Sequence, residues 1–365
     1  MDYLDEFLSP FDTRKLKKTG FLLLIDRCNV RDHRYRLYNL INETLGRLGF
    51  DVHRFYFDRS PLICRNDAFP GGISVEKLYE DNQDAALILF ADGLQFINTG
   101  ERCPLVFPCY VESLTKWKHR FFVSAQPVPL WGIRERLIAE KLFPVIVPFS
   151  PDGMRAVADS LMEEENGRDW FEHWKETGCS YTTTPICVDK DINFIGSLIT
   201  EPIRKWIAAC AMLPELDPGM TQALERLVRP WFKDAEWGWP IHSYLGVSQL
   251  LRLEWFVKGY IPNRYRRQMI GSWLTREEVG TICRFLCEQL GDEPDPDREQ
   301  QFRLALYGVL GEEDATVLNG KTGILSSLLK EPGGERFIDI VVLDYAINAK
   351  IIRYNIPEQY LRQIR

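Results

Sequence analysis

The sequence predicts an α/β protein, a mainly parallel sheet with helices on both faces, followed by a mostly α-helical domain. Two short apolar runs predict the sheet: one ends on Asp26 and the other, beginning at residue 85, ends on Asp92. Runs of this length are typical of strands buried on both faces of a parallel sheet. From about residue 193 such runs fade and apolar residues recur at helical spacing, which predicts the second part.

Strands and helices are expected to alternate through the N-terminal half. The strands are predicted at 21–26, 52–57, 85–90, 120–124 and 143–149, with a further edge strand near 62–64. The helices are predicted at 32–48, from Ser74 onward, within 104–118, and at 132–141 and 152–162. This alternation indicates crossover connections between parallel strands.

The predicted domains follow from where these patterns change. They are an N-terminal extension over 1–19, the α/β domain over 20–163, a connector over 164–192 and the helical domain over 193–365. Aromatic residues around Trp170 predict a short helix in the connector. In the helical domain, Thr275 and Glu278 form a capping-box pattern that opens a helix toward Leu290. Residues 337–345 fit a helix, but their β-branched content also fits a strand.

Charge and cysteine content limit the function classes. The net charge of −7 argues against sequence-independent nucleic-acid binding, which needs a concentrated basic surface. No apolar stretch approaches the about 20 residues that a membrane helix needs, and the first residues lack the pattern of a signal peptide. The 9 cysteines form no Cys-x-x-Cys pair. We therefore expect a cytoplasmic protein with buried, reduced thiols.

The aspartates that close the two apolar runs raise the question of a metal site. Asp26 and Asp92 are expected at the sheet edge where open α/β sheets bind ligands. A von Willebrand A domain binds Mg²⁺ there through Asp-x-Ser-x-Ser, but this chain has Cys28 and Val30 at the serine positions. A neutral thiol is a poor Mg²⁺ ligand and valine is none. The sequence therefore predicts no cofactor, and Mg²⁺ at Asp26 and Asp92 is disfavoured.

An enzyme is an alternative function. His33 could act as a general base beside Asp26 and Asp92, which makes these three residues the catalytic candidates. The strands are not followed by the His and Cys of a caspase-like protease, and no glycine-rich dinucleotide or P-loop motif is present. A lone histidine beside a helix face is more often packed or exposed than catalytic. The sequence therefore favours a protein that is not an enzyme.

Aromatic and basic residues of the helical half are the candidates for partner binding. Trp237 and Trp239 stand near proline and glycine, as aromatic anchors of protein interfaces often do, although tryptophans also fill helical cores. Arg264, Arg266 and Arg267 surround Tyr265 and could contact nucleic acid or an acidic partner. The alternative for this basic segment is a solvated helix start.

Several short motifs resemble a known family. These are Asp26-Arg27-Cys28 after the first strand, Ala91-Asp92-Gly93 after a later strand, and Pro127 to Trp131 after the next. Residues 224–228 and 241–247 add an apolar helix followed by a histidine-containing segment. Together they resemble degenerate von Willebrand A-like proteins of bacterial conflict systems, which occur beside formylglycine-generating-enzyme-like, NTPase or peptidase modules. The resemblance implies an accessory or adaptor role and supplies no catalytic residue.

The function expected from the sequence is therefore a non-enzymatic adaptor subunit of a bacterial defence-type system. Its partner would be an effector, an NTPase or a peptidase of the same system, and no membrane is involved. One alternative is a hydrolase or nuclease-type effector that uses the sheet edge around Asp26, His33 and Asp92. A second alternative is a nucleic-acid-binding subunit that uses residues 264–267.

Overall fold

The computed structural model describes most of the chain and divides it into two compact units. The described residues are 11, 16, 19–27, 31–58, 60–96, 107–108, 110–162, 168–178, 186, 191–232, 250–291, 296–312, 315–330 and 339–362. The first unit comprises residues 1–185 and 242–252, and the second comprises 186–241 and 253–365. The first boundary lies inside the predicted connector. Residues 250–252, which the sequence assigned to the helical domain, belong to the first unit, where Leu251 packs against the core.

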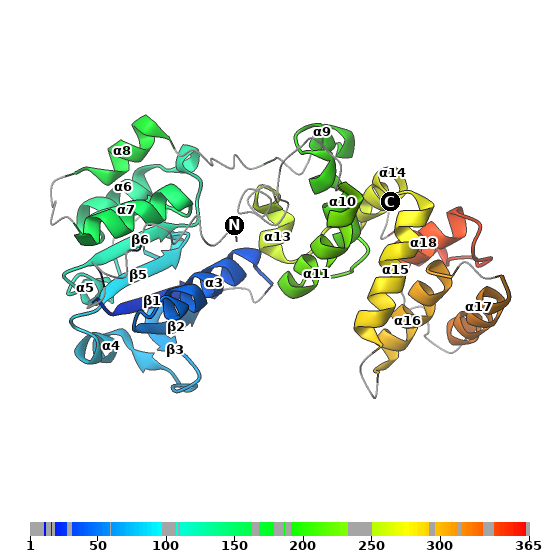
Figure 1. Ribbon diagram of the computed structural model, residues 1–365, viewed down its shortest axis with the longest axis horizontal. Coiled ribbons are helices and arrows are strands. Elements are labelled where there is room, and N and C mark those ends of the chain that lie inside the picture. The colour runs from blue at the N-terminus through cyan, green and yellow to red at the C-terminus, as the bar shows by residue number, and fades with distance from the viewer. Residues whose placement is uncertain are drawn as a thin grey trace. The chain divides into compact units, whose positions relative to one another are not determined.

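The first unit is built on a seven-stranded sheet with the order β4-β3-β2-β1-β5-β6-β7 (Figure 1). Strand β1 pairs in parallel with β2 and β5, and β6 and β7 continue the parallel part, whereas β3 and β4 add antiparallel strands beyond β2. The predicted strands are confirmed, including the edge strand near 62–64. Their bounds are Phe21–Asp26 (β1), Val52–Asp58 (β2), Ser60–Arg65 (β3), Ile73–Ser74 (β4), Ala86–Ala91 (β5), Arg120–Ser124 (β6) and Val145–Pro148 (β7).

Helices cover both faces of this sheet. Residues that lie opposite each other on neighbouring parallel strands point to the same face of the sheet, and successive residues of one strand point to opposite faces. Leu89 lies opposite Phe122, so Phe90 and Phe122 point to opposite faces. Phe90 contacts the ring of Tyr38 from α3 (His33–Arg47), with ring centroids 4.7 Å apart. Phe122 lies on the side of α6 (Ile133–Lys141), because a Cβ atom at Gly93 would meet both Phe122 and α6. The predicted α/β arrangement is therefore confirmed.

The remaining helices of the first unit follow the predicted pattern with one difference. Ser74 caps α4 by accepting a hydrogen bond from the backbone of Lys77, as its position before an apolar residue predicts. The helix expected within 104–118 is only a short one, α5. The bounds are Val75–Asp81 (α4), Val111–Leu114 (α5), Pro151–Met162 (α7) and Trp170–Thr177 (α8), with 3-10 turns at Leu94–Phe96 (η1) and Val128–Leu130 (η2).

The described residues of the second unit form helices and connecting loops, with no strand among them (Figure 1). Thr275 and Glu278 form the predicted capping box of α15, and Gly291 ends that helix. The segment that fitted both helix and strand is helical from Ile340, because Asp339 caps it there. The bounds are Ile192–Ser197 (α9), Glu201–Cys210 (α10), Pro218–Val228 (α11), Arg229–Phe232 (η3), Glu254–Lys258 (α13), Asn263–Trp273 (α14), Arg276–Leu290 (α15), Arg298–Leu310 (α16), Ala315–Lys330 (α17), Ile340–Asn348 (α18) and Glu358–Leu361 (α19).

Two further expectations bear on the described residues. No helix among them is long and apolar enough to cross a membrane. Cys64, Cys210 and Cys283 are buried free thiols, as predicted, and Cys287 is half-buried. Burial raises the pKa of the Cys64 and Cys210 thiols to about 12, so these thiols stay protonated and unreactive near neutral pH.

Candidate functional site

The carboxyl ends of β1 and β5 form the candidate site, because the strand order reverses between them. The chain leaves β1 for β2 on one side, whereas β5 leads to β6 and β7 on the other. Open α/β sheets bind ligands in the crevice at such a switch point. Asp26 is the last residue of β1, and Asp92 directly follows β5, its neighbour in parallel register. The structure therefore brings the two predicted acids to the same edge.

Asp92 holds the turn that follows β5. Its Oδ1 atom accepts a hydrogen bond of 2.9 Å from the backbone N–H of Leu94. Gly93 has a φ of +80°, a conformation that suits glycine, and a Cβ atom there would approach Ile138 Cδ1 to 2.9 Å. This close approach packs the turn against α6. One carboxylate oxygen of Asp92 thus serves local structure, and the side chain as a whole is half-buried.

A third acid at this edge, Asp32, is neutralised by an arginine. Asp32 caps α3 by accepting a 2.9 Å hydrogen bond from the backbone of Arg34, and it also accepts bonds of 2.9 and 2.6 Å from the Nε and Nη2 atoms of Arg34. Burial disfavours the charged guanidinium, but Asp32, with a smaller contribution from Asp92, raises the pKa of Arg34 above its ordinary value. We expected no role for Asp32 and Arg34; an aspartate at the start of the predicted helix is the signal for the cap.

Tyr38 lies beneath these charges on the buried face of α3. Its ring contacts those of Phe90 and Phe149, with centroid distances of 4.7 and 4.8 Å. Its hydroxyl is buried and has no hydrogen-bond partner among the described residues. Burial raises the pKa of Tyr38, Arg34 opposes the shift, and the nearby acids, including Asp26, add to it. The hydroxyl is therefore neutral.

His33 is the first residue of α3 and is buried, with 5% of its surface exposed. Its Nδ1 atom lies 3.1 Å from the carbonyl oxygen of Arg31, which ties the ring to its own loop. Arg27, beside Asp26, places its guanidinium 5.3 and 5.4 Å from the ring centroids of Tyr35 and Tyr56. In the described part of the chain, no three His, Cys, Asp or Glu side chains come together in a metal-binding arrangement.

The basic segment of the second unit divides into three different environments. Arg266 is 2% exposed and pairs with Asp339, and its Nε atom donates a 2.8 Å hydrogen bond to the carbonyl of Ala211. Its guanidinium therefore holds the fold together and does not face a partner. Arg267 is partly exposed and pairs with Asp344 at 2.7 Å, and Arg264 lies over the ring of Tyr265. Trp237 and Trp239 lie outside the described residues.

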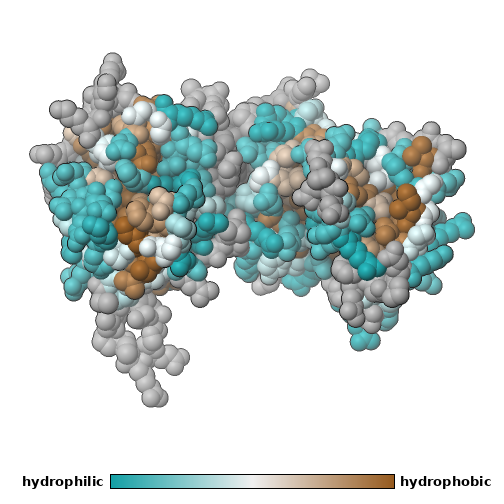
Figure 2. Space-filling model, turned by 90° about the horizontal axis from the view of Figure 1, so that it is seen from below, coloured by the Kyte–Doolittle hydropathy of each residue, from teal (hydrophilic) through white to brown (hydrophobic). Residues whose placement is uncertain are grey.

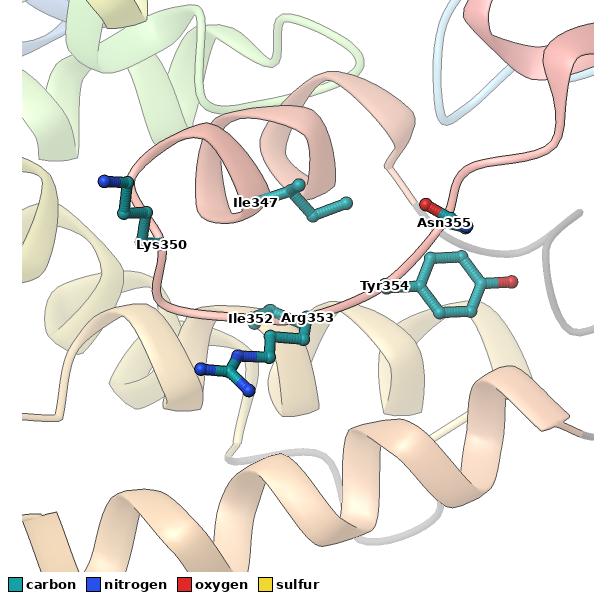
Figure 3. A pocket seen from close by; sticks show the side chains of 6 residues that line it. All are labelled: Ile347, Lys350, Ile352, Arg353, Tyr354 and Asn355. Atoms are coloured by element: carbon teal, nitrogen blue, oxygen red, sulfur yellow. The ribbon is translucent and has the colours of Figure 1, made fainter.

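A cavity of about 580 Å³ lies where the chain leaves α18, and the sequence did not indicate it. Ile347 and Ile352 supply apolar lining, and Lys350 and Arg353 are exposed cations at its border. Figure 3 shows the Lys350 and Arg353 side chains extending in different directions. Because the two cations do not converge, this cavity is a weaker candidate than the sheet edge. Its lining residues are Ile347, Lys350, Ile352, Arg353, Tyr354 and Asn355.

Local structure uses part of the hydrogen-bonding capacity of the side chains at the sheet edge. Asp32 accepts hydrogen bonds from Arg34, and one oxygen of Asp92 accepts a hydrogen bond from a backbone N–H. One ring nitrogen of His33 lies within hydrogen-bond distance of a neighbouring carbonyl oxygen. A general base needs an accessible lone pair aimed at a substrate proton, and these contacts reduce the number of lone pairs available for that role. No protein-family model matches the chain, and neither a curated protein nor a solved structure matches it.

Proposed function

We propose that this chain is a non-enzymatic interaction subunit and that the carboxyl edge of its sheet binds a protein partner. The observation that carries the proposal is a group of exposed apolar side chains at that edge. Leu94, Leu130 and Ile133 are 57%, 56% and 67% exposed, respectively. Leu94 follows β5, and the other two follow β6, the parallel neighbour of β5.

The position of these three residues distinguishes them from ordinary surface apolar residues. Single exposed apolar side chains are normal, and they reach the surface in both units (Figure 2). Three large ones lie on the loops that follow two neighbouring strands at one sheet edge, and Leu94 is two residues after Asp92. The Cβ position of Gly93 lies near Ile138 and Arg134 of α6, so the loop after β5 and the start of α6 are neighbours. A cluster of this kind is a feature of protein-binding surfaces.

The charges at the edge fit a surface better than a reaction centre. The guanidinium of Arg34 neutralises Asp32, and Arg27 is held against two tyrosine rings. Asp26 and Asp92 would form part of a polar rim around the apolar group, as in most protein interfaces. The resemblance of the first-strand and later-strand motifs to conflict-system proteins supports an effector, an NTPase or a peptidase as the class of partner.

Affinity capture from the native host with a matched pair of variants tests this proposal. Leu130→Asp combined with Ile133→Asp places two charges in the apolar group and should abolish capture of the specific partner. Ile324→Asp, at a 60% exposed position of α17 in the other unit, is the control and should leave capture unchanged. Equal capture by all three proteins would contradict the proposal. Turnover in a hydrolase and nuclease screen that Asp26→Ala abolishes would favour the enzyme alternative instead.

A further inference from the structure

A polar face of α7 turns toward an aromatic face of α8 and leaves a cavity of about 330 Å³ between them. Figure 1 shows the two helices near each other in the first unit. The α7 residues in the lining recur at helical spacing, so they form one face of the helix. Arg155 and Arg168 are exposed, whereas Ala156 and Trp174 are buried, so the cavity opens to solvent between the two helices. The lining consists of Asp152, Arg155, Ala156, Asp159, Ser160, Arg168, Trp170, His173 and Trp174.

The cavity has balanced charges of both signs. Asp152 and Asp159 supply two carboxylates, and Arg155 and Arg168 supply two guanidinium groups. Within the described residues, neither arginine forms an ion pair with a carboxylate, although Arg168 lies 5.0 Å from the ring centroid of Trp170. Burial lowers the pKa of His173, and Arg168 adds to the shift, so this ring is neutral near pH 7. A ligand with one positive and one negative group therefore fits better than an anion or a cation.

The aromatic wall adds an apolar surface and an unused donor. Trp170 and Trp174 stack with ring centroids 6.3 Å apart, and His173 contacts both rings. The indole N–H of Trp174 is buried and has no hydrogen-bond partner in the described part of the chain. Buried donors without an acceptor are rare and costly.

We infer that this cavity binds a free α-amino acid with an apolar or aromatic side chain. Its ammonium group would donate to Asp159, and its carboxylate would accept from Arg155 and Arg168. Its side chain would contact the Trp170 ring. A nucleotide fits less well because its several negative charges would meet two carboxylates. This site is independent of the proposed partner surface.

Calorimetric titration of the full chain tests the inference with three probes. L-phenylalanine carries both charged groups, 3-phenylpropionate lacks the ammonium, and 2-phenylethylamine lacks the carboxylate. L-phenylalanine should bind about tenfold more tightly than either analogue, because each analogue leaves one set of charged partners unused. Adenosine monophosphate and inorganic phosphate represent the competing anionic ligands.

Variants assign each charged group to its half of the ligand. Asp159→Asn should weaken phenylalanine binding about tenfold and leave 3-phenylpropionate unchanged. Arg155→Gln should weaken phenylalanine and leave 2-phenylethylamine unchanged. Glu172→Gln is the matched control, because Glu172 is on α8 but outside the lining and lies 3.3 Å from Arg136. Failure of L-phenylalanine to bind at millimolar concentration, tighter binding of the nucleotide or phosphate, or an equal effect of each variant on all three probes would overturn the inference.

Discussion

Two arginine–aspartate pairs, one in each unit, show how differently the same interaction can serve a fold. Arg34 pairs with Asp32, two residues before it, at the start of α3. Arg266 pairs with Asp339, 73 residues after it, and so joins α14 to the start of α18. The first pair is local and partly exposed, whereas the second is buried and connects segments far apart in the sequence.

The difference lies in how many partners each pair satisfies. Besides its pair with Asp339, Arg266 donates to the carbonyl of Ala211 at 2.8 Å and to the side chain of Asn263 at 3.2 Å. Asp339 uses its other oxygen to accept from the backbone of Val341 at 3.1 Å. A buried charge is stable only with such full compensation. The second pair therefore organises the helical unit, whereas the first neutralises one acid at the sheet edge.

Removing Arg266 is expected to have the largest effect. Arg266→Ala leaves the buried Asp339 without its partner and should lower the free energy of unfolding of the second unit by about 3–5 kcal/mol. Urea unfolding measures the loss, and hydrogen exchange should locate it in α14 and α18. Lys258→Ala is the matched control, because Lys258 and Glu254 are 49% and 47% exposed and their 2.8 Å pair should contribute at most about 1 kcal/mol. Equal losses for the two variants would contradict the contrast.

Removing Asp32 tests the local pair and should cost less. Asp32→Ala deletes the cap of α3 and the partner of Arg34, so we expect a loss of about 1–2 kcal/mol. Arg34 is 20% exposed at its side chain and can turn toward water, which limits the penalty. Asp32→Asn keeps a capping oxygen and should recover most of the loss in urea unfolding. A loss as large as that of Arg266→Ala would mean that the local pair is also a central structural element.

The sequence predicted the sheet because its signals are local and strong. The runs that became β1 and β5 are apolar at every buried position, and this pattern fits only a strand covered on both faces. The capping box at Thr275 is equally local and is confirmed. Within 104–118 the sequence predicted a loop and a helix without fixing the bounds of that helix, and the described helix covers Val111–Leu114.

The candidate site was only partly predictable. Asp26 and Asp92 could be placed at one edge because parallel strands end together. The burial of Arg266 could not be predicted, because its partner Asp339 lies in a helix whose position depends on tertiary contacts. The composition of a run of arginines beside a tyrosine does not tell whether each arginine lies on the surface or in the core. The cavity between α7 and α8 likewise forms only when two helical faces meet.

Replacing the capping residue of α15 measures the stability contribution of a second local interaction, which can be compared with that of the Asp32 cap. The Thr275 hydroxyl accepts from the backbone of Glu278 at 3.2 Å, while Glu278 accepts from the backbone of Thr275 and from Lys205, each at 2.7 Å. Thr275→Ala should lower the free energy of unfolding by about 1 kcal/mol. Thr275→Ser keeps the hydroxyl and should behave like the native protein in the same urea titration. A loss with serine equal to that with alanine would show that the methyl group, not the cap, is responsible.

The pH dependence of the unfolding free energy gives the smallest expected effect and concerns His173 of the first unit. Burial first, and then Arg168, lowers the pKa of His173 in the folded protein, and Glu176 opposes this shift. The unfolded chain, with a histidine pKa of about 6.5, therefore binds more protons than the folded chain as the pH falls below that value. His173 thus contributes stability above about pH 6.5 that is lost as the pH approaches its lower folded pKa. His173→Gln should flatten this part of the curve of unfolding free energy against pH, measured by urea unfolding between the two values. An unchanged slope in the variant would assign the pH dependence of this range to groups other than His173.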